Sequence, residues 1–124
     1  MALEGIIKSL PGVVAGEDLT DYKHKFVVIS GDFEVERADD TDTVPVGVLL
    51  NAPDEDEAAT VGVIGMLPVI AGESLSAGDS VTADSDGKAT EIGDDEMAFG
   101  VVVKGGDSDE VISVLAQPAI TISE

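Results

Sequence analysis

The chain has 124 residues, with no cysteine, no tryptophan, one tyrosine and three phenylalanines. The lack of cysteine excludes a disulfide framework, a thiol nucleophile and a metal site built on thiolates. No stretch approaches the roughly 20 apolar residues that cross a bilayer, so we expect no membrane partner. The N-terminus lacks a basic start followed by a long apolar run, so we expect no signal peptide and synthesis in the cytoplasm.

Positive charge is the second scarcity. Six Lys and Arg residues stand against 26 Asp and Glu residues, a formal net charge of -20. Contacts to phosphate need a basic patch, so direct binding of nucleic acid is not expected. The mean hydropathy is nevertheless positive, at +0.22, which favours a folded chain with its acid outside. Concentrated salt screens self-repulsion on this scale, and the composition therefore favours a salt-loving source, with an ordinary acidic surface as the alternative.

The apolar residues that are present make up 44% of the chain and are mostly valine, isoleucine, leucine and alanine. β-Branched side chains suit pleated strands, and small aliphatic cores are thin. We expect one all-β domain, either a small barrel (including the β-tulip form) or a sandwich, with at most one short helical turn over residues 17–22. The expected boundaries are an N-terminal arm at 1–16, the β-rich body at 17–116 and a C-terminal tail at 117–124.

Apolar runs and turn residues place the strands. Gly31-Asp32 and Asp84-Ser85-Asp86-Gly87 are strong turn signals, because glycine accepts a positive φ and aspartate caps its own backbone. The runs around them predict strands at 26–30, 33–37, 45–51, 59–65, 80–83, 88–92, 97–104 and 110–116. Residues 66–70 either extend the strand at 59–65 or start a new one.

One strand–turn–strand unit occurs twice. Residues 47–61 align without a gap on residues 100–114, with identity at a Gly, two Val, two Asp and one Glu. Both copies are apolar in their arms and acidic in the turn. The chain therefore builds β structure from similar units and carries its charge in loops, which is typical of a scaffold and unusual for an enzyme.

No catalytic or metal-binding signature is present. His24, the single histidine, lies between Lys23 and Lys25 with no nucleophile motif nearby, so we interpret it as a surface residue. The 84–87 turn lacks the first and last ligands of an EF-hand loop, and the acids at 54–57 and 107–110 are best explained as solvated loop residues. We therefore expect no enzyme, no cofactor and no metal. An acidic β-domain that binds calcium or glycans stays open as the alternative.

Charge is unevenly distributed. Residues 1–37 hold four cations against seven acids, whereas residues 38–124 hold two cations against nineteen acids. The N-terminal third is therefore the part that can approach another acidic surface at the lowest electrostatic cost. Chance placement of four cations explains the asymmetry equally well.

The order and spacing of several segments resemble the small capsid decoration (head cement) proteins of tailed viruses. The segments are Val46–Pro53, Glu57–Val61, Gly72–Val81, Asp84–Ala89 and Phe99–Val103, within roughly residues 13–116. The heavy acid load departs from the usual pattern of that family and fits a virus of a halophilic host.

The resemblance implies a structural virion protein on the outer face of an icosahedral capsid, where it bridges subunits of the major capsid protein. It further implies a homo-oligomer, with a trimer favoured. We predict that the arm and the small basic patch contact the capsid while the acidic loops face solvent. The predicted contact residues are Leu3, Ile6, Ile7, Lys8, Leu10, Val13, Lys23, His24 and Lys25.

Overall fold

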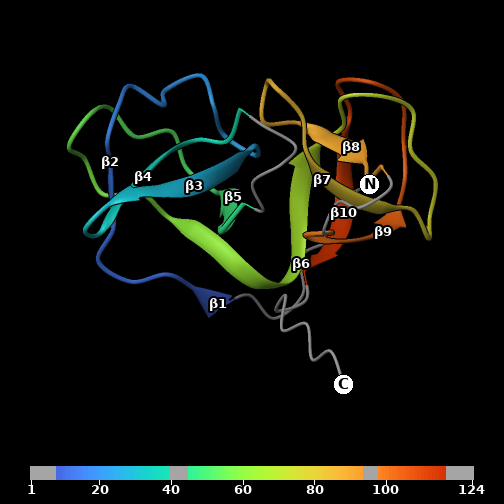
Figure 1. Cartoon of the computed structure of the whole chain (residues 1–124), viewed down its shortest axis with the longest axis horizontal. Coiled ribbons are helices and arrows are strands. Elements are labelled where there is room, and N and C mark those ends of the chain that lie inside the picture. Colours follow the sequence, from blue (N-terminus) through green and yellow to red (C-terminus); the bar gives the residue numbers. More distant parts are fainter. Residues whose placement is uncertain (1–7, 40–44, 94–97, 117–124) are drawn as a thin grey trace.

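The structure is a computed structural model that describes residues 8–39, 45–93 and 98–116. Its strands follow the apolar runs between acidic turns (Figure 1). They are β1 (Lys8–Ser9), β2 (Val14–Ala15), β3 (Phe26–Gly31), β4 (Glu34–Arg37), β5 (Gly47–Leu49), β6 (Val61–Ile70), β7 (Ser80–Ala83), β8 (Ala89–Glu91), β9 (Gly100–Lys104) and β10 (Val111–Ala116).

All ten strands belong to one sheet, in the order β2-β4-β3-β5-β6-β10-β9-β7-β8, and β1 pairs with β6 outside this path. The all-β prediction is confirmed, but the sheet is not closed into a barrel. Over the described residues the chain contains no helix, and 17–22 forms turns and bends instead. No helix in these ranges could therefore span a membrane.

The long strand β6 joins two groups of strands (Figure 1). Its first part, to Ile64, pairs with β5 and β1, and its second part, from Gly65, pairs with β10. Gly65 has a φ of 112°, a conformation that a residue with a Cβ rarely adopts. The sequence leaves open whether 66–70 extends or restarts the strand before it. In the structure this segment extends that strand, which changes partners at Gly65.

The two groups repeat the same topology. We call residues 8–64 the first half and residues 65–116 the second half. Each half contains a hairpin, a third strand antiparallel to the first strand of that hairpin, and a fourth strand that returns along the third. The sequence repeat at 47–61 and 100–114 is therefore one part of a duplication that covers both halves.

Backbone hydrogen bonds show the same duplication residue by residue. Four bonds of the first half have counterparts of almost equal length in the second half. The matched N–H to C=O pairs are Ala15 to Glu57 (2.9 Å) and Ala71 to Glu110 (2.8 Å), Gly16 to Val35 and Gly72 to Ala89 (both 2.8 Å), Leu19 to Pro53 (3.0 Å) and Leu75 to Gly106 (2.9 Å), and Val46 to Val27 (2.9 Å) and Phe99 to Val81 (2.8 Å).

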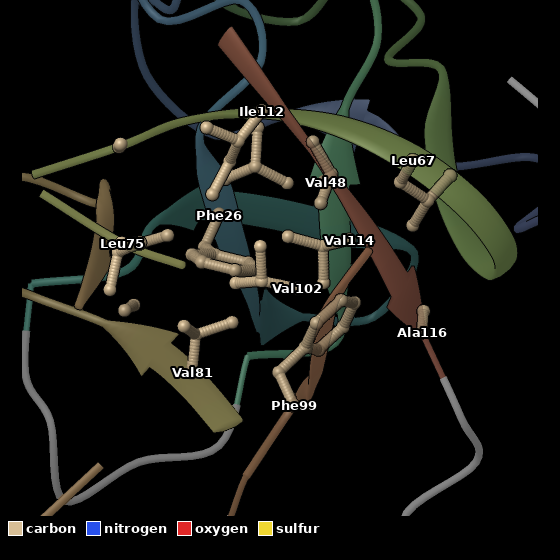
Figure 2. Packing of buried hydrophobic residues seen from close by; sticks show 14 of the residues in the cluster. Phe26, Val48, Leu67, Leu75, Val81, Phe99, Val102, Ile112, Val114 and Ala116 are labelled. Carbon is tan, nitrogen blue, oxygen red and sulfur yellow. The ribbon is translucent and has the colours of Figure 1, made fainter. Parts of the chain in front are cut away.

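Each half has its own core. The first cluster consists of buried residues of the first half, including Val13, Leu19, Val27 and Val61. The second cluster holds the residues at equivalent positions of the second half, but it also takes in Phe26, Ala38 and Val48 from the first half. The second core is therefore shared between the halves (Figure 2).

Residues 8–16, assigned to the arm by their sequence, take part in the sheet. β1 pairs with β6, and β2 pairs in parallel with β4. Val13 and Ala15 are buried in the first core, because this segment fills the place that the end of β6 occupies in the second half. Residues 1–7 and the tail 117–124 lie outside the described residues.

Candidate functional site

The nine predicted contact residues fall into three groups. Leu3, Ile6 and Ile7 lie outside the described residues, and Lys8 begins β1. Leu10 is half-buried against the first core, and Val13 is buried in it with 4% of its surface exposed. Because Val13 is needed to fill the core, it is not available to a partner while the chain is folded.

The Lys23-His24-Lys25 segment lies at the junction of the two halves. His24 donates its N–H to the carbonyl of Leu49 at 2.7 Å, and its own carbonyl accepts the N–H of Ile70 at 2.9 Å. The φ of His24 is 69°, and its counterpart Gly78 has a φ of 97°. The backbone of this segment is thus held by both halves. Lys23 is exposed, and Lys25 is partly buried.

Tyr22 organises the cations around this segment. Its ring is 5% exposed, and its hydroxyl donates to the carbonyl of Ala38 at 3.1 Å. Lys25 Nζ lies 5.1 Å from the ring centroid, and Arg37 Cζ lies 6.0 Å from it, so both cations face the aromatic ring. Burial raises the pKa of the Tyr22 phenol, although the hydrogen bond to Ala38 opposes this effect.

The second half adds a further cation. Lys88 follows Gly87, which lies so close to Tyr22 that a Cβ added to this glycine would meet the Tyr22 hydroxyl. Lys88 Nζ lies 2.7 Å from Asp109 Oδ1. The hydrogen bond from Lys88 lowers the pKa of Asp109, and the charge of Lys25 lowers it further. Lys25 and Arg37 thus face Tyr22, and Lys25 and Lys88 act on the same carboxylate from the two halves. We call these three cations, with Lys23 beside them in the sequence, the cation cluster.

The sequence predicts Lys23 and Lys25 as part of this cluster but does not identify Arg37 and Lys88. The hairpin register could have found Arg37, because β3 and β4 pair Val27 with Arg37 across the Gly31-Asp32 turn. No comparable local signal exists for Lys88, since it reaches the cluster from the other half.

A hollow of about 390 Å³ lies beside the cluster. Its walls carry both signs of charge together with three hydroxyls, so it is not a simple anion site. The lining residues are Asp18, Thr20, Asp21, Tyr22, Lys25, Arg37, Ser85 and Asp86.

Two glutamates at equivalent positions accept hydrogen bonds from the second strand of the hairpin in each half, β4 and β8. Glu17 accepts hydrogen bonds from the Arg37 backbone at 2.9 Å and from its guanidinium at 3.1 Å. Desolvation raises the pKa of Glu17, but the bonds and charge of Arg37 outweigh it, and the net pKa is lowered. Glu73 accepts the N–H of Glu91 and the hydroxyl of Thr90, both at 2.8 Å, and these bonds lower its pKa.

The acidic loops have a structural role. In both, the N–H of the first aspartate bonds to Oε1 of the glutamate three residues later at 2.8 Å, for Asp54 with Glu57 and for Asp107 with Glu110. Both loops are exposed along 54–57 and 107–110, whereas Gly87 of the 84–87 turn is buried. Within the described ranges, no group of three or more His, Asp or Glu side chains could hold a metal ion.

Comparison with known proteins identifies a shared fold. No protein-family model matches the chain, and no curated protein matches it. Among solved structures, the chain is similar to the N base of head fiber gp8.5 in bacteriophage phi29, with a TM-score of 0.70 and 21% identity. The match covers 90% of this chain and 95% of that chain, so the likeness extends over both halves. At this identity it shows the fold alone.

Gly87 offers a test of the contact that joins the halves at Tyr22. We expect Gly87→Ala to destabilise the protein by about 2–5 kcal/mol, because a Cβ there meets the phenol and a positive φ costs roughly 1–2 kcal/mol. Gly78→Ala is the matched control, since Gly78 also has a positive φ but has no atom within 4 Å of its added Cβ. It should cost only the backbone part. Equal losses in urea unfolding would contradict the role of Tyr22.

Proposed function

We propose that this chain is a structural virion protein that binds the outer surface of an icosahedral capsid and bridges subunits of the major capsid protein. The observation that carries the proposal is the fold shared with a phage head fiber base over 90% of the chain. The described surface supports it, because four of the six cations belong to the cation cluster while the acidic loops are exposed.

The proposed contact with the capsid consists of the N-terminal residues 1–7 and the cation cluster. The backbone around His24 is bonded to both halves, so a contact there is presented on a rigid support. Lys23 is exposed, and no carboxylate in the described part of the chain lies within ion-pair distance of its amine. An exposed cation on a rigid backbone suits an acidic capsid surface, where charge complementarity directs the approach.

We further propose that the protein acts as a homo-oligomer, with a trimer favoured, and that many copies bind one shell. Simultaneous attachment of linked contacts raises the effective concentration of each further contact. A lattice of such copies resists separation more strongly than one contact does. This role requires no catalytic group, which agrees with loop carboxylates that serve loop hydrogen bonds.

Lys23→Glu tests the proposed contact. We expect binding to empty heads of the same virus to weaken by about tenfold at low salt. The reversal replaces the attraction between Lys23 and an acidic capsid surface by a repulsion. The control is Lys104→Glu, which changes the net charge equally but lies in β9 of the second half. Equal affinities of the two variants in a co-sedimentation titration would place the contact elsewhere.

A salt titration tests the proposed halophilic host. Because the net charge is -20, the folded protein repels itself, and added salt screens this repulsion. The melting temperature should therefore rise as NaCl increases from about 0.1 M to about 2 M. A melting temperature that falls over this range would contradict adaptation to concentrated salt.

A further inference from the structure

The junction between the halves is an apolar face of the first half inserted into the second core. Phe26, Ala38 and Val48 are buried there, and Val28 and Leu50 pack against it. The Phe26 and Phe99 rings meet edge to face, with centroids 4.9 Å apart. Figure 2 shows Phe26 and Val48 among Val102, Val114 and Phe99. We call Phe26, Val28, Ala38, Val48 and Leu50 the junction face.

The duplication reproduces this face on the second half. The backbone pairing of Phe26 with Val48 corresponds to that of Ser80 with Val101, and that of Val28 with Glu36 corresponds to Thr82 with Thr90. We call the equivalent set the outer face, and it carries no charged side chain. Its members are Ser80, Thr82, Ile92, Val101 and Val103.

The outer face is partly exposed to solvent, and one of its hydroxyls has no hydrogen-bond partner in the described part of the chain. Val103 is 48% exposed, and Val101 and Ile92 are partly exposed. Thr82 is fully buried, and its hydroxyl has no hydrogen-bond partner. In the first half the same positions are covered by the second half. In the described residues no third half follows to cover them again.

The surface that would receive this face is also repeated. In the second half, Leu67, Phe99 and Ala116 are buried in the core that the junction face enters. Their counterparts in the first half, Leu10, Val46 and Val63, are only partly buried. We call these three residues the open rim. The difference follows from the junction, because only the second core receives an apolar face from a neighbouring half.

We propose that the outer face of one copy docks on the open rim of a second copy, so that copies join head to tail and repeat the junction already present within the chain. The inference deepens the proposed homo-oligomer by naming its interface. Copies with a net charge of -20 repel one another, and both surfaces are formed without charged side chains. A head-to-tail contact forms a ring when its rotation closes.

Val103→Glu tests the outer face. Sedimentation equilibrium in about 1 M NaCl, where charge repulsion is screened, should show an oligomer for the unaltered chain. The variant should self-associate about 100-fold more weakly or worse, because the interface would bury an unpaired carboxylate. The matched control is Val111→Glu, at a valine 43% exposed but outside the outer face, which should leave the oligomer intact. A monomeric unaltered chain, or two variants that behave alike, would overturn the proposal.

Mixing distinguishes head-to-tail docking from a symmetric contact. Val46→Glu blocks the open rim, while Val103→Glu blocks the outer face. Each variant alone should be monomeric, and an equimolar mixture should form a one-to-one complex through the intact pair of surfaces. A mixture that stays monomeric would overturn the head-to-tail geometry. If Val46→Glu does not fold, the comparison of Val103→Glu with Val111→Glu still decides the proposal.

Binding to heads separates this inference from the proposed function. Unaltered protein that oligomerises as described but does not bind empty heads leaves the interface in place and removes the capsid role. Protein that binds heads but stays monomeric at every concentration, on and off the shell, removes the interface and leaves the capsid role.

Discussion

The structure depends on the insertion of one half into the core of the other. Phe26 and Val48 are paired in β3 and β5 of the first half, but their side chains complete the core of the second half, where Phe26 meets Phe99. A chain with three phenylalanines places two of them in this contact. Small aliphatic cores bury little area per residue, so one large aromatic contact shared by both halves contributes a large part of the apolar burial available to them.

The two halves share one backbone arrangement but carry different side chains at equivalent positions. Its hydrogen bonds are preserved where the backbone is fixed, and its side chains differ where the surroundings differ. Phe26 corresponds to Ser80, because the first residue enters a core and the second faces outward. His24 keeps a positive φ at a position where the second half has Gly78. The proposed functional surfaces arise where the two halves diverge, at the cation cluster, the outer face and the open rim.

The sequence predicts the local elements well because strand periodicity and turn chemistry are local. The all-β class, the hairpin at Gly31-Asp32, the 84–87 turn and the repeated acidic loop could all be predicted. The sequence leaves open whether 66–70 extends the strand before it, because the outcome depends on which partners lie on each side of Gly65. The place of Lys88 in the cation cluster could not be predicted for a similar reason, since packing between the halves brings the preceding residue, Gly87, beside Tyr22. Leu10 and Val13 were expected at a partner's surface, but core packing places Val13 inside and Leu10 against it.

The central claim is that the halves are coupled through a shared core, and calorimetry of Phe26→Ser, which gives the first half the residue of its counterpart Ser80, tests it most directly. Truncation of a buried phenylalanine costs about 3–5 kcal/mol, here mostly at the junction. The account predicts one cooperative unfolding transition for the unaltered protein and two separated transitions for the variant. A variant that still unfolds in a single two-state transition, at a lower temperature only, would contradict it.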